Sequence, residues 1–258
     1  MTSQTRRKPG PKYEGLRITR EFEVQSRTPK SLRKRIKGLL AYLPASHTLR
    51  LLAYWSDLRV WKKQYLSADT PAYEHRYGMW QDLMAQILPD RIAYLEFGCA
   101  NGEIVEYWAE HNTHPDSRFW GFDTFTGMPE EWKGLGWKVE EGAWSQGGEP
   151  PQPMDPRVGY VKGRFQDSVE GFIEREAPFD LDVDHFVIHI DADLYSATLY
   201  VLVMMRPILD RATVLFDEFD CVLDEMRALD DFCRSFGLQY KVLATAASCE
   251  KIAIQFIK

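Results

Sequence analysis

Apolar and polar residues follow two different patterns along the chain, and the pattern changes near residue 90. Before that point the apolar residues recur with helical spacing in three stretches, which begin at Ser31, Leu51 and Tyr73. The residues before Ser31 follow neither pattern. The predicted parts of the chain are therefore an irregular basic tail (1–30), an N-terminal helical region (31–90) and an α/β domain (91–258).

From Arg91 onward, short apolar runs alternate with stretches of helical spacing. The predicted strands are "IAYLE", "RFWGFD", "GYVKG", "HFVIHID", "ATVLFDE", "QYKVLAT" and "KIAIQFI". The predicted helices are Glu103–His111, Asp167–Glu176, Tyr195–Leu209 and Leu223–Phe236. This alternation predicts a Rossmann-like, mostly parallel sheet that helices cover on both faces. No helical stretch separates the last two strands, so we expect them to form an antiparallel C-terminal hairpin at one edge.

The composition favours a single sizeable core, because 45% of the 258 residues are hydrophobic. No apolar run approaches the ~20 residues of a membrane span, and the N-terminus lacks the apolar region of a signal peptide. The four cysteines form no CxxC pair, which argues against a disulfide framework or a zinc site. We therefore expect a cytoplasmic protein without membrane contact.

Basic residues gather near the N-terminus. Residues 1–40 contain twelve Lys or Arg and three Glu, whereas residues 41–258 carry a net charge of −15. The basic segment could contact nucleic acid or an anionic surface. However, no aromatic residues are interleaved in the basic runs as stacking platforms, and the rest of the chain is acidic. The favoured interpretation is a solvated tail followed by an amphipathic helix that packs on the body.

The carboxyl ends of the predicted strands carry the candidate chemistry, because ligands of a parallel sheet bind there. Each of these ends carries an acidic residue, and none carries a cluster of Lys or Arg. The residues at five successive strand ends are Glu96 with Gly98 and Gly102, then Asp123, then Gly163 and Asp167, then Asp191 and Asp193, and finally Asp217 and Glu218.

This pattern discriminates between classes of ligand. A phosphate cradle requires a P-loop lysine or a G-x-G-x-x-G fingerprint, but the spacing here is G-x-x-x-G with no lysine after it. Asp123 at the end of the second strand suits the two hydroxyls of a ribose, and Glu96 near the first turn suits a cation. A positively charged nucleoside such as S-adenosylmethionine meets these requirements. The alternative is that the glycines only allow a tight turn from strand to helix.

Four stretches, "YLEFGCANGEIVEYWA", "WGFDTFTGMPEEW", "VKGRFQDSV" and "VIHIDADLYSAT", resemble one enzyme family. The chain resembles the macrocin-type O-methyltransferases, which are class I S-adenosylmethionine-dependent enzymes that modify sugar hydroxyls in antibiotic biosynthesis. The resemblance implies the class I methyltransferase fold and a small-molecule acceptor. It also implies that Glu96, Gly98, Gly102 and Asp123 hold the cofactor, with Asp167 near its adenine.

The metal site of this family can be transferred position by position. Asp191 matches the acid that binds Mg²⁺ and lies where the acceptor hydroxyl loses its proton. Asp217 and Glu218 match the other two ligands, and an all-oxygen site at neighbouring strand ends suits Mg²⁺ or Ca²⁺. The chain departs from the family in carrying Glu218 and Phe219 where Asp and Tyr are usual, and "DRATVLF" in place of a Gly-Gly turn.

Two polar residues near Asp191 have more than one interpretation. His189 lies two residues earlier on the same strand face, where it could orient the carboxylate, help to bind substrate, or be a hydrogen-bonded core histidine. Asp193 is predicted to cap or solvate the helix that begins near Tyr195. Asp220 and Asp224, beyond the fifth strand, are interpreted as charges at a helix N-terminus rather than as metal ligands.

The segment 127–159 is predicted to be a lid over the cofactor and the acceptor. It holds five prolines, seven glycines and three tryptophans, and loops of this length are usually functional or disordered. Trp132, Trp137 and Trp144 argue against disorder, and their rings can stack on a sugar. The alternatives are an Ω-loop that packs its tryptophans on its own surface, or a contact in a homo-oligomer.

The predicted function is methyl transfer from S-adenosylmethionine to a hydroxyl of a sugar or glycosylated small molecule, assisted by Mg²⁺. Asp191 and His189 are the candidate catalytic residues. One alternative is a glycosyltransferase in which Asp191 and Asp193 hold a metal, which would require basic residues for a diphosphate. Another is a non-catalytic protein that binds S-adenosylmethionine. Nucleic acid is not expected as a partner.

Overall fold

The computed structural model describes residues 30–40, 46–87, 90–134 and 136–257. The chain divides into two compact units, 1–45 and 46–258. The described part of the first unit is the helix α1 (Lys30–Leu40), on which Leu32 and Ile36 are exposed. The predicted tail lies outside the described residues except for Lys30.

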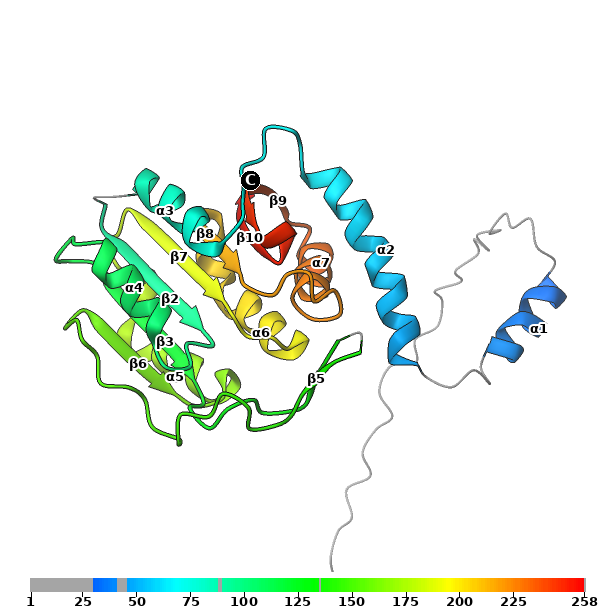
Figure 1. Cartoon of the computed structure of the whole chain (residues 1–258), viewed down its shortest axis with the longest axis horizontal. Helices are drawn as coiled ribbons and strands as arrows, with labels where there is room; N and C mark the ends of the chain where they lie inside the picture. Colours follow the sequence, from blue (N-terminus) through cyan, green and yellow to red (C-terminus); the bar gives the residue numbers. More distant parts are fainter. Residues whose placement is uncertain (1–29, 41–45, 88–89, 135, 258) are drawn as a thin grey trace, which may run out of the picture. The chain divides into compact units, whose positions relative to one another are not determined.

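The second unit is built around an eight-stranded sheet (Figure 1). Its strands are β1 (Ala72–Tyr73), β2 (Ile92–Phe97), β3 (Arg118–Asp123), β6 (Val158–Lys162), β7 (His185–Ile190), β8 (Ala212–Phe216), β9 (Gln239–Ala246) and β10 (Lys251–Ile257). Their order is β1-β9-β10-β8-β7-β2-β3-β6, and among these strands only β10 runs antiparallel to its neighbours. This is a Rossmann-like, mostly parallel sheet. The predicted hairpin of β9 and β10 lies near one edge, and the two-residue β1 extends that edge.

Helices cover both faces of the sheet. They are α2 (His47–Tyr65), α3 (Arg76–Ile87), α4 (Glu103–His111), α5 (Phe165–Glu176), α6 (Tyr195–Met205) and α7 (Glu225–Phe236). One core contains residues of α3 and α4, and the other contains residues of α2, α5, α6 and α7. Ala93 and Leu95 of β2 join one core while Ile92 and Tyr94 join the other, which explains the continuous apolar run. None of the described helices is long and apolar enough to cross a membrane.

The bounds predicted for strands and helices after residue 90 agree with the structure to within two residues, with one exception. The helix predicted to run from Tyr195 to Leu209 ends at Met205 and continues as a short 3-10 helix (Arg206–Arg211). Pro207 explains the difference, because proline has no N–H group and cannot continue the α-helical hydrogen bonds.

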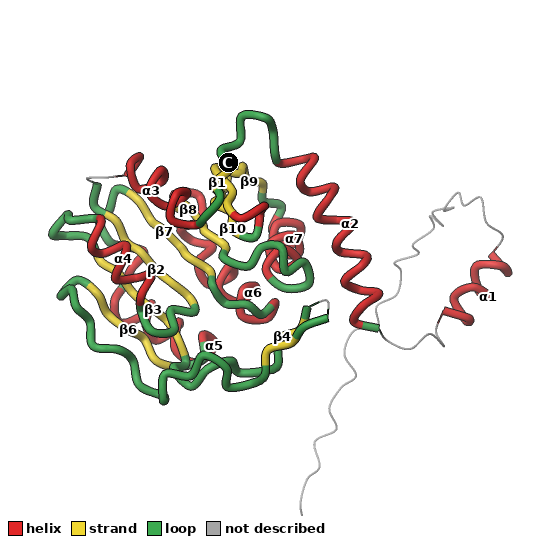
Figure 2. Tube along the Cα trace, viewed as in Figure 1, coloured by secondary structure: helices red, strands yellow, loops and turns green. Residues whose placement is uncertain are grey.

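The long connection between β3 and β6 contains structure that the sequence pattern did not predict. β4 (Trp132–Lys133) and β5 (Lys138–Val139) pair as a short antiparallel ribbon in this segment. Figure 2 shows the ribbon between two long stretches of loop. The segment 127–159 therefore has an internal scaffold, which fixes where its tryptophans lie.

Candidate functional site

A cavity of about 540 Å³ lies at the carboxyl ends of β2, β3, β7 and β8. Most of the predicted site residues line it, namely Gly98, Asp123, Asp167, Asp191, Asp217 and Glu218. The other three predicted residues, Glu96, Gly102 and His189, are not part of this lining. The fold thus brings together acids at the ends of β3, β7 and β8 and in the first turn of α5, which are far apart in the sequence.

Gly98 and Gly102 are required by close backbone contacts at the first turn. Gly98 has a φ of +102°, and a Cβ atom there would lie 1.7 Å from the carbonyl oxygen of Asp191. Gly102 has a φ of +80°, and a Cβ atom there would lie 2.2 Å from the hydroxyl oxygen of Tyr160. Both glycines therefore have a steric role whatever the ligand is, and only Gly98 also borders the cavity.

Glu96 lies behind the first turn, on the face of the sheet that α3 and α4 cover. The residue is 1% exposed, and its Oε2 accepts a hydrogen bond from the Tyr94 hydroxyl at 3.4 Å. Its Oε1 has no hydrogen-bond partner among the described residues. Burial, followed by the charge of Asp217, raises the pKa of Glu96 well above its ordinary value. These surroundings stabilise the protonated form of Glu96 relative to its carboxylate.

Asp123 connects the turns that follow β2 and β3. Its Oδ2 accepts a hydrogen bond from the N–H of Ala100 at 3.0 Å, and its Oδ1 accepts one from the N–H of Phe125 at 2.6 Å. Ala100 and Phe125 have φ values of +42° and +58°, which residues with side chains adopt rarely. Asp123 therefore holds two strained turns together, while lone pairs of the same carboxylate remain available to a ligand.

Asp191 and Asp193 follow β7 and line the cavity. Burial, followed by the charges of Asp217 and Asp193, raises the pKa of Asp191 well above its ordinary value. Burial and the charge of Glu218 raise the pKa of Asp193 to about 8. A raised pKa makes each carboxylate a better proton acceptor once it is ionised, and a cationic ligand in the cavity would favour the ionised form.

The helix α6 is capped by a residue other than the predicted one. Its N-cap, Leu194, makes no side-chain capping hydrogen bond, and the N–H of Tyr195 donates instead to Oδ1 of Asp224 at 3.3 Å. Asp193 has a φ of +58° and lines the cavity. The capping role predicted for Asp193 therefore belongs to Asp224, which reaches α6 from the loop after β8.

His189 lies in the buried layer behind the cavity and is 1% exposed. Its Nδ1 lies 2.7 Å from the Tyr94 hydroxyl, and its ring packs edge-on against Trp80 with centroids 5.4 Å apart. Its Nε2 lies 3.7 Å from Oδ1 of Asp217. The environment is that of a core histidine, and the carboxylate that it faces is Asp217 rather than Asp191.

Asp217 at the end of β8 lies beside two cations that the sequence pattern did not place there. Its Oδ2 is 3.0 Å from Nη1 of Arg76 and 3.5 Å from Nζ of Lys251. Burial raises the pKa of Asp217, but His189, Lys251 and Arg76 outweigh this effect and bring the pKa below its ordinary value. Arg76 begins α3 and Lys251 begins β10, so no motif near Asp217 could have revealed either contact.

The acid next to it, Glu218, also contacts Lys251, with 3.5 Å between Oε1 and Nζ. Burial raises the pKa of Glu218 to about 7 although Lys251 opposes this change. The backbone N–H of Glu218 donates to Oε2 of the buried Glu225 at 3.0 Å. These contacts hold Glu218 at the rim of the cavity.

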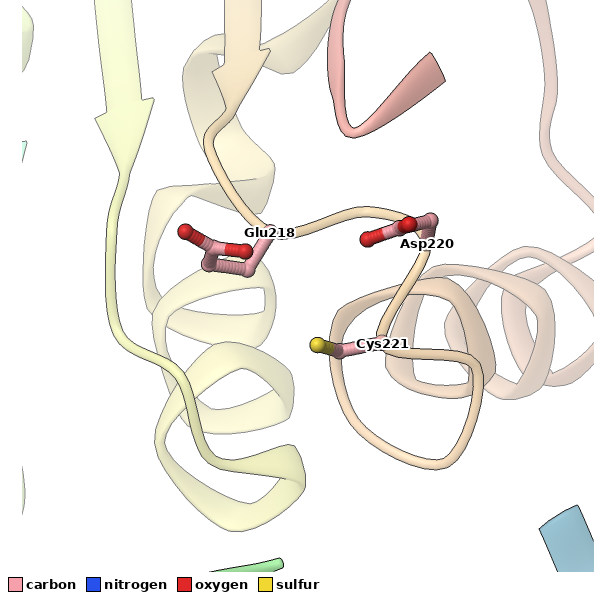
Figure 3. Close-up of side chains that lie close together, drawn as sticks. All are labelled: Glu218, Asp220 and Cys221. Atoms are coloured by element: carbon pink, nitrogen blue, oxygen red, sulfur yellow. The ribbon is translucent and has the colours of Figure 1, made fainter. Parts of the chain in front are cut away.

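One compact group of possible metal ligands occurs in the described part of the chain, and it is not the predicted one. Ligand atoms of Glu218, Asp220 and Cys221 all lie within 4.8 Å of one another. Figure 3 shows the three side chains pointing to the same side of the loop after β8. Burial and the neighbouring acids raise the pKa of the Cys221 thiol, whereas metals bind the thiolate. The predicted trio of Asp191, Asp217 and Glu218 forms no group of this compactness.

The segment 127–159 forms one wall of the cavity. Trp132 is 7% exposed and donates its indole N–H to Oδ2 of Asp224 at 3.1 Å, and it packs against Met128 and Leu194. Trp144 is 53% exposed and lines the cavity. The buried tryptophan thus anchors the segment to the loop after β8, and an exposed tryptophan faces the space where a ligand would bind.

Comparison with known proteins finds similarity in structure only. No family model matches the chain, and no curated protein matches it. The O-methyltransferase NovP is 16% identical over 68% of this chain and 75% of its own, with a TM-score of 0.46. CalS11, a TDP-rhamnose 3'-O-methyltransferase of calicheamicin biosynthesis, is 19% identical over 90% of this chain and 96% of its own, with a TM-score of 0.47. The O-methyltransferase TomG from Streptomyces achromogenes is 15% identical over 88% and 94%, with a TM-score of 0.41. Similarity at this level does not identify a cofactor or a substrate.

Proposed function

We propose that this protein transfers a methyl group from S-adenosylmethionine to a hydroxyl of a sugar or glycosylated small molecule. The observation that carries the proposal is the charge of the cavity at the strand ends. Its acidic lining residues are Asp123, Glu130, Asp167, Asp191, Asp193, Asp217 and Glu218, and its basic lining residues are Arg76 and Arg164. A lining with seven carboxyl side chains and two arginines lacks the several cations that the phosphates of a nucleotide require, and a cationic nucleoside would favour the ionised form of these carboxyl groups.

The cofactor is proposed to lie over the turn at Gly98. Asp123, at the end of β3, would accept hydrogen bonds from the ribose hydroxyls, and Asp167, in the first turn of α5, would lie near the adenine; both line the cavity. Glu96 and Gly102 would act indirectly by shaping the turn. The sulfonium would then lie among Asp191, Asp193 and Asp217, where its positive charge offsets theirs.

The acceptor is proposed to lie between these acids and the segment 127–159. Trp144 offers an exposed aromatic face at the wall of the cavity, and such faces stack well on sugar rings. The N–H···O contact between Trp132 and Asp224 attaches the segment to the loop after β8. The segment would thus act as a lid that excludes water during transfer.

The proposed reaction is an in-line displacement. The acceptor oxygen forms a bond to the methyl carbon while the carbon–sulfur bond breaks, and the electron pair of that bond remains on sulfur. The carboxylate of Asp191 takes the proton of the hydroxyl as general base. His189 does not reach the cavity, so we assign it a positioning role on Asp217 through the 3.7 Å contact of its Nε2.

The divalent metal implied by the family resemblance does not fit these residues well. Asp217 and Glu218 would both be needed as ligands, yet their carboxylate oxygens lie within 3.5 Å of the cationic groups of Arg76 or Lys251. A metal ion would have to displace these contacts. No step of the proposed reaction therefore depends on a metal.

Two measurements test this function. Calorimetry should show that the native protein binds S-adenosylhomocysteine and does not bind UDP-sugars or NAD. Incubation with radiolabelled S-adenosylmethionine and a panel of hydroxylated glycosides should then transfer label to an acceptor. Preferential binding of a UDP-sugar would instead support a glycosyltransferase. Binding of the cofactor without transfer to any acceptor would support a non-catalytic protein.

A further inference from the structure

The ammonium group of the buried Lys251 is surrounded by oxygen atoms at the end of β8. The residue is 4% exposed. Its Nζ donates to the carbonyl oxygen of Asp217 at 2.8 Å and lies 3.5 Å from both Oδ2 of Asp217 and Oε1 of Glu218. It also contacts Oε1 of Glu250. Four oxygens from three acidic residues thus surround one cation, as they would surround a bound metal ion.

The strand pairing explains why this lysine reaches the site. β10 runs antiparallel to β8, and Ile252 is paired with Phe216. Lys251 precedes Ile252 and Asp217 follows Phe216, so an antiparallel register places Lys251 beside Asp217. The lysine therefore enters from the C-terminal hairpin, on the side of β8 opposite to β7.

A second cation, Arg76, contacts the carboxylate of Asp217 and comes from an element that precedes the sheet strands β2 to β10 in the sequence. Nη1 of Arg76, at the start of α3, lies 3.0 Å from Oδ2 of Asp217. The side chain of Arg76 is 30% exposed and its guanidinium lies 5.7 Å from the ring centroid of Trp80. Lys251 and Arg76 together place two positive charges beside Asp217, and Lys251 also contacts the carboxylates of Glu218 and Glu250. Buried carboxylates without such partners would be strongly unfavourable.

We propose that Lys251 and Arg76 replace the divalent metal ion, so that this site works without a metal. Asp217 and Glu218 are then not metal ligands but the anionic partners of a cation that the chain itself supplies. The two cations hold Asp217 as a carboxylate, so that it does not compete with Asp191 for the proton of the acceptor. This inference rests on the proposed function only for its catalytic consequence, because the occupancy of the site can be measured without turnover.

Binding of Mn²⁺ to the native protein tests the proposal directly. Mn²⁺ should be followed by electron paramagnetic resonance, with and without S-adenosylhomocysteine, in the native chain and in D217N and E218Q. The expected result is either no stoichiometric binding or binding that neither substitution changes. Stoichiometric binding that D217N or E218Q abolishes would overturn the proposal. This measurement stands even if no acceptor is ever methylated, which would count against the proposed function alone.

Replacing Lys251 tests the same idea by a gain of metal binding. K251Q removes the ammonium and leaves the surrounding oxygens, so Mg²⁺ should raise its melting temperature by about 3 °C or more at ten times the dissociation constant. The native chain and K241Q, which alters an exposed lysine on β9, should not respond. An equal response of K251Q and the native chain to Mg²⁺, whatever its size, would overturn the proposal. If K251Q does not fold, the Mn²⁺ measurement on the native chain decides whether Asp217 and Glu218 bind a metal ion.

Chelation provides the catalytic readout. Native enzyme treated with EDTA and then desalted should retain its methyl transfer rate to within about twofold, because general-base catalysis by Asp191 requires no metal. A loss of activity that Mg²⁺ restores would overturn the proposal, while the proposed methyl transfer itself would remain valid.

Discussion

The contact between Trp132 and Asp224 makes the attachment of segment 127–159 measurable through pH. Trp132→Phe removes the indole N–H that donates to Oδ2 of Asp224 at 3.1 Å and keeps an aromatic ring in the buried position. Asp224 still accepts the N–H of Tyr195 at 3.3 Å, so its carboxylate keeps one of its two described donors.

The magnitude follows from the charge of the acceptor. A hydrogen bond to a charged group contributes about 1.5–3 kcal/mol, and the lower end applies because the second donor remains. Burial raises the pKa of Asp224 to about 6, while the N–H groups of Trp132 and Tyr195 oppose this change. Without the N–H of Trp132 the pKa should rise by a further unit or so, since one pKa unit corresponds to about 1.36 kcal/mol.

The sign of the pH dependence follows from proton linkage. Between its ordinary pKa of 3.8 and about 6, Asp224 binds more protons in the folded than in the unfolded chain, so stability contributed by this group falls as pH rises through that range. In Trp132→Phe the stability should continue to fall up to about pH 7, because the pKa of Asp224 should be about one unit higher. The variant should therefore lose about 1.4 kcal/mol more stability at pH 8 than at pH 5, or roughly 3–5 °C in melting temperature.

Thermal unfolding of the native chain and of Trp132→Phe at both pH values is the assay. Trp137→Phe serves as the control, because Trp137 belongs to the same segment and is 42% exposed. Trypsin should also cleave the segment about tenfold faster in Trp132→Phe at pH 8, if the hydrogen bond forms only in the closed state. A loss of stability that is equal at pH 5 and pH 8, or equal in Trp137→Phe, would refute the reasoning.

Three further substitutions probe the cavity. Gly98→Ala places a Cβ atom 1.7 Å from the Asp191 carbonyl oxygen at a φ of +102°. We therefore expect the variant to be unfolded at 37 °C, and a melting temperature equal to that of the native chain would contradict the geometry. Asp123→Ala should weaken the binding of S-adenosylhomocysteine by roughly 1.5–3 kcal/mol in calorimetry. It should also lower the melting temperature, because the N–H groups of Ala100 and Phe125 lose their acceptor. Unchanged affinity would remove Asp123 from the ribose site. Asp191→Asn should leave cofactor binding intact and slow methyl transfer by ~10²-fold or more, and full activity of this variant would show that another group takes the proton.

Local patterns in the chain were sufficient to predict the longer strands and the helices after residue 90 and their alternation, but not the two-residue strands β1, β4 and β5. A run such as "IAYLEF" is buried along its whole length, and a continuous run of mostly apolar residues predicts a strand in the middle of a sheet that is covered on both faces. The clustering of the acids at the ends of β3, β7 and β8 could also be predicted, because parallel strands that alternate with helices present their carboxyl ends at one edge of the sheet. The end of α6 could also have been found from the sequence, since Pro207 stands inside the predicted helix.

The ionic partners of these acids were decided only by the tertiary structure. Asp217 contacts Arg76 and Lys251, which precede and follow it by many residues and enter from α3 and β10. Asp224 caps α6 in place of Asp193 because the loop after β8 folds back over the N-terminus of that helix. Helical and strand periods depend on neighbouring residues, whereas an ion pair or a capping hydrogen bond depends on a distance of about 3 Å between groups on separate elements. Such distances arise only when the elements pack, and they decide whether an acid at a strand end is available to a metal, a ligand or a lysine of the chain itself.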